Sequence, residues 1–341
     1  MPASDYDAII LGGGISALTV ALQLQMKGYA VVVIDKPAGS GAAGLPAGLA
    51  NPAYGREAKK SWESEACIES LYRLSELADV RKNDWQEGWT QWLEPGEAAE
   101  RFPLVQTKYG ALWIQVGMTI DLPCLLTELR TKLNTMGSTL YSATTSDVYE
   151  GRNNHTVAAD GRELRSPRII FAPGSGIGDY PQWSSLKFNR VKGQVTAAAF
   201  SGFSDPGCSV ASSGYAAFTG YNRVVVGSTY EHTWQNSSPS HETGRELIAR
   251  FRNMCPQIGE SLTHADNWAG IRLTTPDRKP CVGAHWEIRG FYCIAGMGSR
   301  GLLMAPLAAE LIADHIHSNK KIPAQIDVTR FYRTRRFMNR T

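Results

Sequence analysis

The sequence lacks the marks of several specialised classes of protein. Its six cysteines include no Cys-x-x-Cys pair, and its seven histidines show no metal-ligand spacing. Neither a metal site nor a disulfide framework is therefore predicted, and the thiols are expected to be reduced. Internal repeats and low-complexity tracts are also missing, so a repeat protein is not expected.

Strong net charge and long apolar runs are missing too. The formal net charge is +3 over 341 residues, which gives no support to a dedicated nucleic-acid-binding protein but does not exclude a local basic patch. The first apolar run follows Asp5 and Asp7, where a signal peptide would carry Lys or Arg, and three glycines at 12–14 break it. No export signal or membrane span is predicted, and we expect a cytoplasmic protein.

What the sequence does have is the composition of a globular protein. Apolar residues make up 43% and charged residues 20% of the chain. A chain of this length suits two domains with room to bury a large cofactor. The first 35 residues predict a strand at 6–11, a helix at 15–26 and a second strand at 30–34, all strongly apolar. Such a β–α–β unit is typical of a parallel sheet that is covered on both faces.

A dinucleotide-binding fingerprint occupies this unit. Gly12, Gly14 and Ala17 form the pattern G-x-G-x-x-A between the first strand and the helix, and Asp35 ends the second strand. Gly12 permits the tight turn, Gly14 lets the backbone approach a pyrophosphate, and Ala17 lets the helix pack closely on the strand. An acid at position 35 binds ribose hydroxyls, which favours FAD or NAD over NADP. The fingerprint alone does not choose between FAD and NAD.

Further elements follow along the chain. We predict a charged helix near 60–78 and a helix from 121 to 133 with Asp121 as its cap and Pro123 in its first turn. A buried strand is expected at 168–172, and alternating apolar and polar residues between 188 and 230 predict an antiparallel sheet. Residues 291–295 form one more expected strand, which leads into a glycine-rich loop at 296–301 and a helix at 303–315.

The C-terminal loop and helix carry a resemblance to a known family. The run from Gly296 to Leu311 resembles the flavin-contacting segment of the D-amino-acid oxidase / glycine oxidase (DAO) superfamily of FAD-dependent oxidoreductases. The blocks at 191–194, 214–215, 226–230 and 269–283 also resemble that superfamily and lie in its order. In these motifs the chain is most similar to the FAD oxidase domain of the bifunctional tRNA 5-(carboxymethylaminomethyl)uridine-modifying enzyme. The methyltransferase domain of that enzyme has no counterpart in this sequence.

The resemblance implies an α/β fold with two domains. The first is a doubly wound, Rossmann-type FAD-binding domain, expected to comprise residues 1–52, 137–182 and 268–341. The second is an antiparallel-sheet α+β substrate domain, expected to comprise residues 53–136 and 183–267. FAD is the implied cofactor, and it is expected to be bound non-covalently because no Cys or His falls at a linkage position. The implied cofactor-binding residues are Gly12, Gly14, Ile15, Ser16, Ala17, Asp35, Lys36, Ala47, Gly48, Leu49, Ala172, Gly174, Gly298, Ser299, Arg300, Gly301 and Leu302.

Three residues are implied at the substrate. Arg272 and Tyr215 match the arginine and tyrosine that hold the substrate carboxylate in the family, and Tyr230 lies in a block on the substrate side. A guanidinium fork suits a carboxylate because two parallel N–H bonds fix its orientation. From the sequence alone, Arg272 could instead be a salt-bridging strand residue, and Tyr215 could be a core residue. Ser299 stands where glycine oxidases carry a second arginine, which puts free glycine in doubt as the substrate.

The implied reaction is oxidation of the C–N bond of a small amine or amino acid. Hydride passes to flavin N5, water hydrolyses the resulting imine, and molecular oxygen or another acceptor takes the electrons. Alternatives are an oxidase acting on the carboxymethylaminomethyl group of a modified tRNA uridine, and a flavin-binding protein without turnover. The basic and aromatic tail at 330–337 is a pattern that nucleic-acid binders use, but its aromatics could simply pack on the protein while its arginines stay solvated. Binding of tRNA is therefore not favoured.

Overall fold

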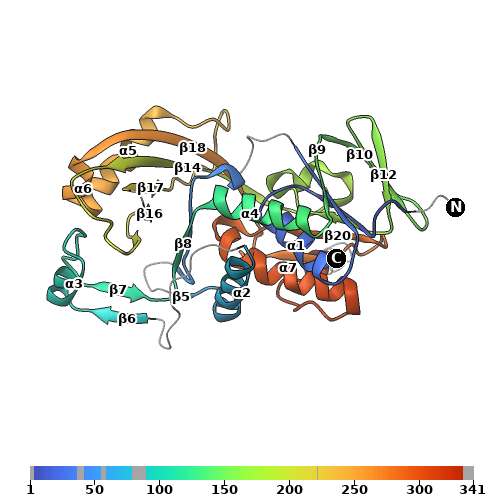
Figure 1. The fold of residues 1–341 in the computed structure, drawn as a ribbon, viewed down its shortest axis with the longest axis horizontal. Helices are drawn as coiled ribbons and strands as arrows, with labels where there is room; N and C mark the ends of the chain where they lie inside the picture. Colours follow the sequence, from blue (N-terminus) through green and yellow to red (C-terminus); the bar gives the residue numbers. More distant parts are fainter. Residues whose placement is uncertain (1–3, 37–41, 55–58, 79–89, 221, 333–341) are drawn as a thin grey trace, which may run out of the picture.

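Residues 4–36, 42–54, 59–78, 90–220 and 222–332 are described by the structure, a computed structural model. Figure 1 shows a lobe with a parallel sheet and helices beside a lobe with a strongly curved antiparallel sheet. The predicted β–α–β unit is confirmed as β1 (Ala8–Leu11), α1 (Ile15–Met26) and β2 (Val31–Asp35). It lies at the centre of the parallel-sheet lobe.

The sheet of this lobe brings together distant parts of the chain. Its order is β19-β20-β13-β1-β2-β9, and only the edge pair β19–β20 is antiparallel among these pairings. The four strands not yet given are β9 (Thr139–Ser142), β13 (Ile169–Phe171), β19 (Cys281–Ala284) and β20 (Phe291–Ala295). The strands predicted at 168–172 and 291–295 are thereby confirmed.

Alternate residues of the central strands face two different cores. Ile10 and Val33 pack with the helices, whereas Ile9 and Val32 pack towards a three-stranded antiparallel meander. This double burial explains why the strands read as continuous apolar runs. The meander consists of β10 (Thr145–Tyr149), β11 (His155–Ala159) and β12 (Arg162–Ser166).

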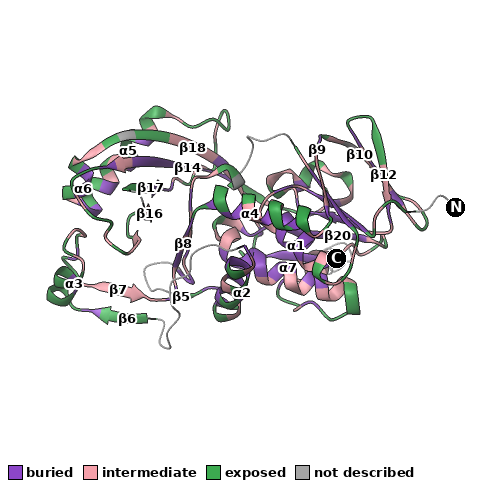
Figure 2. Ribbon diagram, viewed as in Figure 1, coloured by how far each residue is buried: buried purple, intermediate pink, exposed green. Residues whose placement is uncertain are grey.

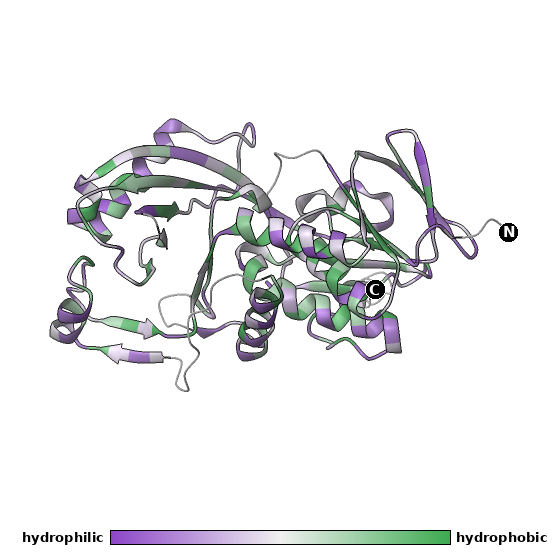
Figure 3. Cartoon of the chain, in the orientation of Figure 1, coloured by the Kyte–Doolittle hydropathy of each residue, from purple (hydrophilic) through white to green (hydrophobic). Residues whose placement is uncertain are grey.

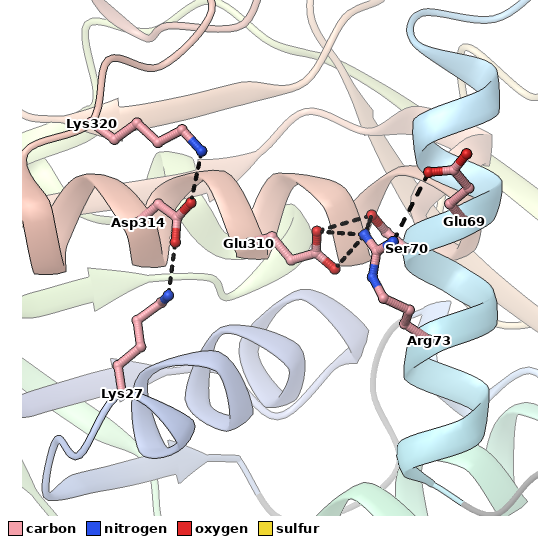
Figure 4. Close-up of polar contacts among 7 residues, drawn as sticks. All are labelled: Lys27, Glu69, Ser70, Arg73, Glu310, Asp314 and Lys320. Atoms are coloured by element: carbon pink, nitrogen blue, oxygen red, sulfur yellow. Dashed lines mark hydrogen bonds and ion pairs between the residues drawn. The ribbon is translucent and has the colours of Figure 1, made fainter.

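Four helices cover the other face of the sheet. They are α1, α2 (Ser64–Leu77), α4 (Leu122–Thr135) and α7 (Gly301–Ser318), with α1 and α2 both packed on α7. Figure 4 shows polar contacts that join α7 to its neighbours. Arg73 of α2 donates to Glu310 Oε2 over 2.9 Å, and Lys27, which follows α1, pairs with Asp314 over 2.7 Å. Partly exposed ion pairs of this kind contribute about 1 kcal/mol or less, so apolar packing supplies most of the stability here.

The antiparallel sheet has the order β15-β16-β17-β14-β18. Helices α5 (His241–Met254) and α6 (Pro256–Glu260) cover one face, and the other face packs on Leu45 and Ala47. The expectation of an antiparallel sheet between 188 and 230 is confirmed. Its strands are β14 (Asn189–Phe200), β15 (Val210–Ala211), β16 (Tyr215–Gly220), β17 (Arg223–Gly227) and β18 (Leu262–Thr274).

Short elements complete the described chain. Helix α3 (Pro95–Arg101) is mostly exposed (Figure 2) and mostly hydrophilic (Figure 3). The two-stranded ribbons are β3 (Gly48–Ala50) with β8 (Met118–Ile120), β4 (Ala53–Tyr54) with β5 (Lys59–Lys60), and β6 (Thr90–Leu93) with β7 (Ala111–Ile114). The 3-10 turns are η1 (Ala42–Gly44), η2 (Gly174–Asp179), η3 (Pro181–Trp183) and η4 (Gly298–Arg300).

We propose a division between the lobes that differs from the expected one. The range 53–136 was assigned to the substrate domain, but its helices α2 and α4 share one core with α1 and α7. The expected boundary at 268 also falls inside β18, a single strand of the antiparallel sheet. We therefore propose that α2 and α4 belong to the parallel-sheet lobe and that β18 belongs wholly to the other. Among the helices of the described residues, none is long and apolar enough to cross a bilayer.

Candidate active site

A single large cleft runs along the parallel-sheet lobe to the antiparallel sheet. Its volume of about 2770 Å³ exceeds the few hundred to about 1,000 Å³ of an ordinary small-ligand pocket. It therefore has room for a dinucleotide together with a substrate. The cleft is lined by nineteen of the predicted residues: Gly12, Gly14, Ile15, Ser16, Asp35, Lys36, Ala47, Gly48, Leu49, Ala172, Gly174, Tyr215, Tyr230, Arg272, Gly298, Ser299, Arg300, Gly301 and Leu302.

Ala17 is the one predicted residue outside that lining. Its side chain is fully buried in the core that joins α1 to the sheet. This position fits the packing role that the fingerprint gives to it, which requires a small side chain between helix and strand.

The glycine turn at one end of the cleft is shaped by backbone. Gly12 has φ +112°, and a β-carbon there would collide with the carbonyl of Ala172. Only glycine meets both conditions without strain. Gly14 precedes α1, and the first turn of α1 has neither a capping side chain nor an acidic residue. The free N–H groups of this helix end are therefore available to an anion.

Asp35 closes this end from the tip of β2. Burial raises the pKa of its carboxyl, while the nearby Arg130 and the backbone N–H groups of Gly13 and Lys36 oppose that rise. Arg130 on α4 lies 3.6 Å from Asp35 Oδ2 and donates to the Gly13 carbonyl over 2.8 Å. Arg130 was not predicted as a site residue, because nothing near it in the sequence shows that α4 reaches the glycine turn.

The middle of the cleft joins the two ends of the chain. The hydroxyl of Ser16, in the first turn of α1, lies 3.8 Å from the sulfur of Met297 in the C-terminal loop. Gly298 has φ +57° and lies against Thr274, and a β-carbon on Gly48 would come within 2.7 Å of Leu302. The main chain is thus left bare on both sides of the cleft, at the segments predicted to contact a flavin ring.

Helix α7 points its N-terminus into the same region. Its first turn contains no acidic residue, and Arg300 at the N-cap makes no side-chain cap. Arg300 instead donates to the carbonyl of Arg278 over 2.8 Å, which ties the loop to the neighbouring turn. Negative charge near the start of α7 is stabilised by the helix N–H groups.

Arg272 of β18 lies in the wall at the far end of the cleft. Its Nη1 donates to the Thr229 carbonyl over 2.8 Å, and its Nη2 donates to Ser228 Oγ over 2.7 Å. The guanidinium lies 4.5 Å from the ring centre of Tyr230, a cation–π contact. On the strand beside it, a β-carbon on Gly193 would collide with the guanidinium, so the glycine makes room for it. Within the described residues no carboxylate pairs with this half-buried arginine.

Tyr215 lies beside this arginine. Burial raises the pKa of its phenol to about 12, although Arg272 lowers it in part and Tyr230 adds to the rise. The ring packs against Gly227, where a β-carbon would come within 2.7 Å of it. A phenol with such a pKa stays protonated at neutral pH and can donate a hydrogen bond.

FAD fits these residues. Three cleft-lining glycines, Gly12, Gly48 and Gly298, stand where a β-carbon would collide with neighbouring protein atoms, so the main chain there carries no side chain. The start of α1 offers N–H groups to a pyrophosphate, Asp35 offers a carboxylate to ribose, and the start of α7 borders the middle of the cleft. Three or more metal-ligating side chains do not cluster anywhere in the described ranges.

Comparison with known proteins agrees with this reading. The family model described as "DAO: FAD dependent oxidoreductase" matches residues 7–88 and 69–315. Glycine oxidase from Geobacillus kaustophilus is 24% identical over 362 residues, which cover 91% of this chain and 92% of that protein. The tRNA 5-methylaminomethyl-2-thiouridine biosynthesis bifunctional protein MnmC of Idiomarina loihiensis is 26% identical over 342 residues. That match covers 90% of this chain but only 55% of the relative, so the chain spans about half of that bifunctional protein.

Solved structures show the same fold. Glycine oxidase from G. kaustophilus superposes with a TM-score of 0.82 at 22% identity, covering 95% of this chain and 98% of that one. L-proline dehydrogenase from P. horikoshii superposes with a TM-score of 0.81 at 19% identity, covering 98% and 99%. Because the family model spans most of the sequence, the family is established by it and the fold by these structures. The chain belongs to the DAO family of FAD-dependent oxidoreductases, and FAD is its cofactor.

Proposed function

We propose that this enzyme oxidises the C–N bond of a small amine or amino acid that carries a carboxylate. The observation that carries the proposal is the environment of Arg272. Arg272 has a half-buried guanidinium in the cleft wall, without a carboxylate partner among the described residues, beside a protonated Tyr215. Two of its five N–H donors are engaged by Thr229 and Ser228, which leaves three for a ligand.

The residues of the chain would bind and orient the substrate. Arg272 holds the carboxylate, the Tyr215 hydroxyl donates a second hydrogen bond to it, and Tyr230 covers one side of the guanidinium. FAD, when bound, supplies the acceptor for the hydride that leaves the carbon next to nitrogen. The substrate amine must be neutral for this transfer, and water then hydrolyses the imine product. Orientation of this kind replaces a dedicated base.

The cofactor would contact the N-termini of two helices, α1 and α7. The N–H groups at the start of α1 would hold the pyrophosphate, and Asp35 would accept hydrogen bonds from the adenosine ribose. The start of α7 would stabilise negative charge on the ring system. We also propose that molecular oxygen or another compound takes the electrons from the reduced cofactor.

A second candidate substrate is a modified uridine in tRNA. The cleft lining carries nine Lys or Arg residues against five Asp or Glu residues. Tyr230 is also a lining residue and is 62% exposed, so its ring could stack on a base. The described part of the basic tail also begins beside the cleft, since Arg330 forms an ion pair with the lining residue Asp277 over 2.8 Å. The tail residues 333–337 lie outside the described residues.

The test is an anaerobic titration of the purified holoenzyme with a panel of compounds. The panel contains amino acids, N-substituted glycines, and uridine nucleosides and tRNA with a carboxymethylaminomethyl group. Loss of the flavin absorbance with an amino acid or substituted glycine supports the lead proposal, and loss with tRNA alone supports the second candidate. A panel in which no compound bleaches the flavin would overturn both.

Arg272→Ala should weaken binding of a carboxylate inhibitor such as benzoate by about tenfold to a hundredfold, as expected for hydrogen bonds to a charged group. Arg73→Ala is the matched control, because it removes an arginine that pairs with Glu310 far from the cleft lining. If Arg272→Ala leaves the affinity unchanged, this arginine does not hold the carboxylate.

A further inference from the structure

A buried cation lies behind the wall that carries Arg272. Lys192 of β14 has a side chain that is only 7% exposed, and its Nζ lies 3.4 Å from Glu231 Oε2. Lys192 is not among the residues that line the cleft. Its strand neighbours are Val191, which pairs with Arg272 across the sheet, and Gly193, on which the guanidinium lies. Because side chains alternate along a strand, Lys192 points to the opposite face of the sheet from Arg272.

The segment 228–231 connects the two faces. It continues past the end of β17 and pairs with β14 through backbone bonds. Lys192 and Glu231 exchange two N–H···O bonds of 2.9 Å, and the Thr229 N–H donates to the Gln194 carbonyl over 3.2 Å. Side chains alternate here as well, so the side chains of Thr229 and Glu231 lie on the same side of the segment as Lys192, although both residues also border the cleft. Ser228 and Tyr230 accompany Arg272 on the cleft face, in agreement with their contacts to it.

Both carboxylate oxygens of Glu231 have partners. Oε1 accepts a hydrogen bond from the Thr229 hydroxyl over 3.0 Å, while Oε2 faces Lys192. The same Thr229 hydroxyl accepts from the Gln194 N–H over 2.9 Å. Thr229 is therefore fixed at its hydroxyl from two sides, and its carbonyl is the group that accepts from Arg272.

Net stability does not account for this ion pair. Taking an ammonium group out of water is costly, and replacement of a buried ion pair by apolar residues is often neutral or stabilising. A charged pair with defined partners can instead fix one register of the backbone. Here the register decides which side chains of 228–231 face the cleft, because a slip by one residue would turn Ser228 and Tyr230 away from Arg272.

We propose that Lys192 and Glu231 are positioning residues that set the orientation of the Arg272 guanidinium from the rear of the sheet. The inference rests on the proposed role of Arg272 as the carboxylate anchor. The ion pair holds the segment 228–231 against β14, the segment presents Ser228 Oγ and the Thr229 carbonyl, and these two acceptors aim the remaining N–H groups at the ligand.

The experiment compares holoenzymes carrying Lys192→Met, Glu231→Gln and Lys27→Met. Lys27 is the control because its side chain is also partly buried and pairs with a carboxylate, Asp314, and neither residue lines the cleft. Benzoate binding, followed by the change in the flavin spectrum, should weaken about tenfold for Lys192→Met, since small misplacements of a binding group have large effects. It should stay within about twofold of wild type for Lys27→Met. In an Arg272→Ala background, Lys192→Met should cause no further loss.

A second readout needs no ligand. Phenylglyoxal modifies accessible guanidinium groups, and peptide mass spectrometry reports its rate at Arg272. That rate should rise in Lys192→Met and in the milder Glu231→Gln, with flavin content unchanged, and should stay at the wild-type value in Lys27→Met. An unchanged rate in both variants overturns the positioning role. Failure of the wild-type enzyme to bind benzoate would instead count against the proposed function, and the phenylglyoxal rates would still decide the role of Lys192.

Discussion

The two ends of the cleft are built in different ways. At the nucleotide end, a contiguous stretch of about twenty residues supplies the turn, the helix start and Asp35, and backbone geometry does most of the shaping. At the substrate end, Arg272, Tyr215 and Tyr230 come from three separate segments and are held by side-chain contacts. A site shaped by backbone is therefore visible in the sequence as a local pattern, whereas a site made of side chains from separate strands depends on how the whole sheet folds.

The largest effect should come from the backbone-built end. Gly12→Ala should abolish flavin retention, because the substitution combines an unfavourable φ of +112° with a collision against Ala172. The ratio of flavin to protein absorbance after purification measures this. Gly28→Ala is the matched control: Gly28 has φ +86° but no atom within 4 Å of an added β-carbon. It should cost only about 1–2 kcal/mol of stability and keep the flavin. Equal flavin content in the two variants would show that the close backbone contact at Gly12 is not needed to retain the flavin.

At the side-chain-built end, Tyr215→Phe should have a smaller effect. Loss of one neutral hydrogen bond should weaken benzoate binding by about threefold to tenfold, while the ring keeps its packing against Gly227. The pH profile adds a sharper test. The pKa of Tyr215 is raised to about 12, and a phenol donates only below its pKa. Wild-type affinity should therefore not fall through about pH 10, where an ordinary tyrosine titrates. Tyr149→Phe, on the exposed meander, is the control.

The smallest effect concerns stability in the parallel-sheet lobe. His155 of β11 is buried against Phe291, and its Nε2 lies 2.9 Å from the Arg289 carbonyl. Burial lowers its pKa, although the Arg289 carbonyl opposes this. The unfolded chain therefore binds the proton more readily, so the free energy of unfolding should fall as pH drops below about 6.5.

Urea unfolding at about pH 7.5 and pH 5.5 measures the slope of the free energy of unfolding against pH. His155→Gln should reduce it, whereas the exposed His241→Gln should not. If the free energy of unfolding depends on pH in the same way in wild type and His155→Gln, the acid sensitivity arises from another group, for example His285, whose pKa burial also lowers.

Much of the parallel-sheet lobe could be predicted from the sequence, because its signals are local. The cap of α4 is an example: the Asp121 side chain accepts from the Cys124 N–H over 2.9 Å, as the order of Asp, Pro and apolar residues predicts. The fingerprint residues likewise lie where their spacing places them.

Other elements carry no such signal. Strand β18 contains Asp266, Asn267 and Gly270, which disfavour strands, and it forms because its pairing with β14 extends over most of its length. The meander and α5 were also not predicted. Arg130, Lys192 and Glu231 act across elements that only the folded chain brings together, so no spacing in the sequence announces them. The proposed substrate residues were predicted from a family resemblance and not from a local pattern.

The strand order of the parallel sheet has a consequence for biosynthesis. Strand β13 lies between β1 and β20, so its outer edge has no partner until Phe291–Ala295 has left the ribosome. The same stretch leads directly to Met297, which meets Ser16 across the cleft. A nascent chain that has already made its glycine turn therefore still lacks one wall of the cleft in which we propose that the flavin ring lies. We therefore expect the cofactor to be captured only after this stretch has been synthesised.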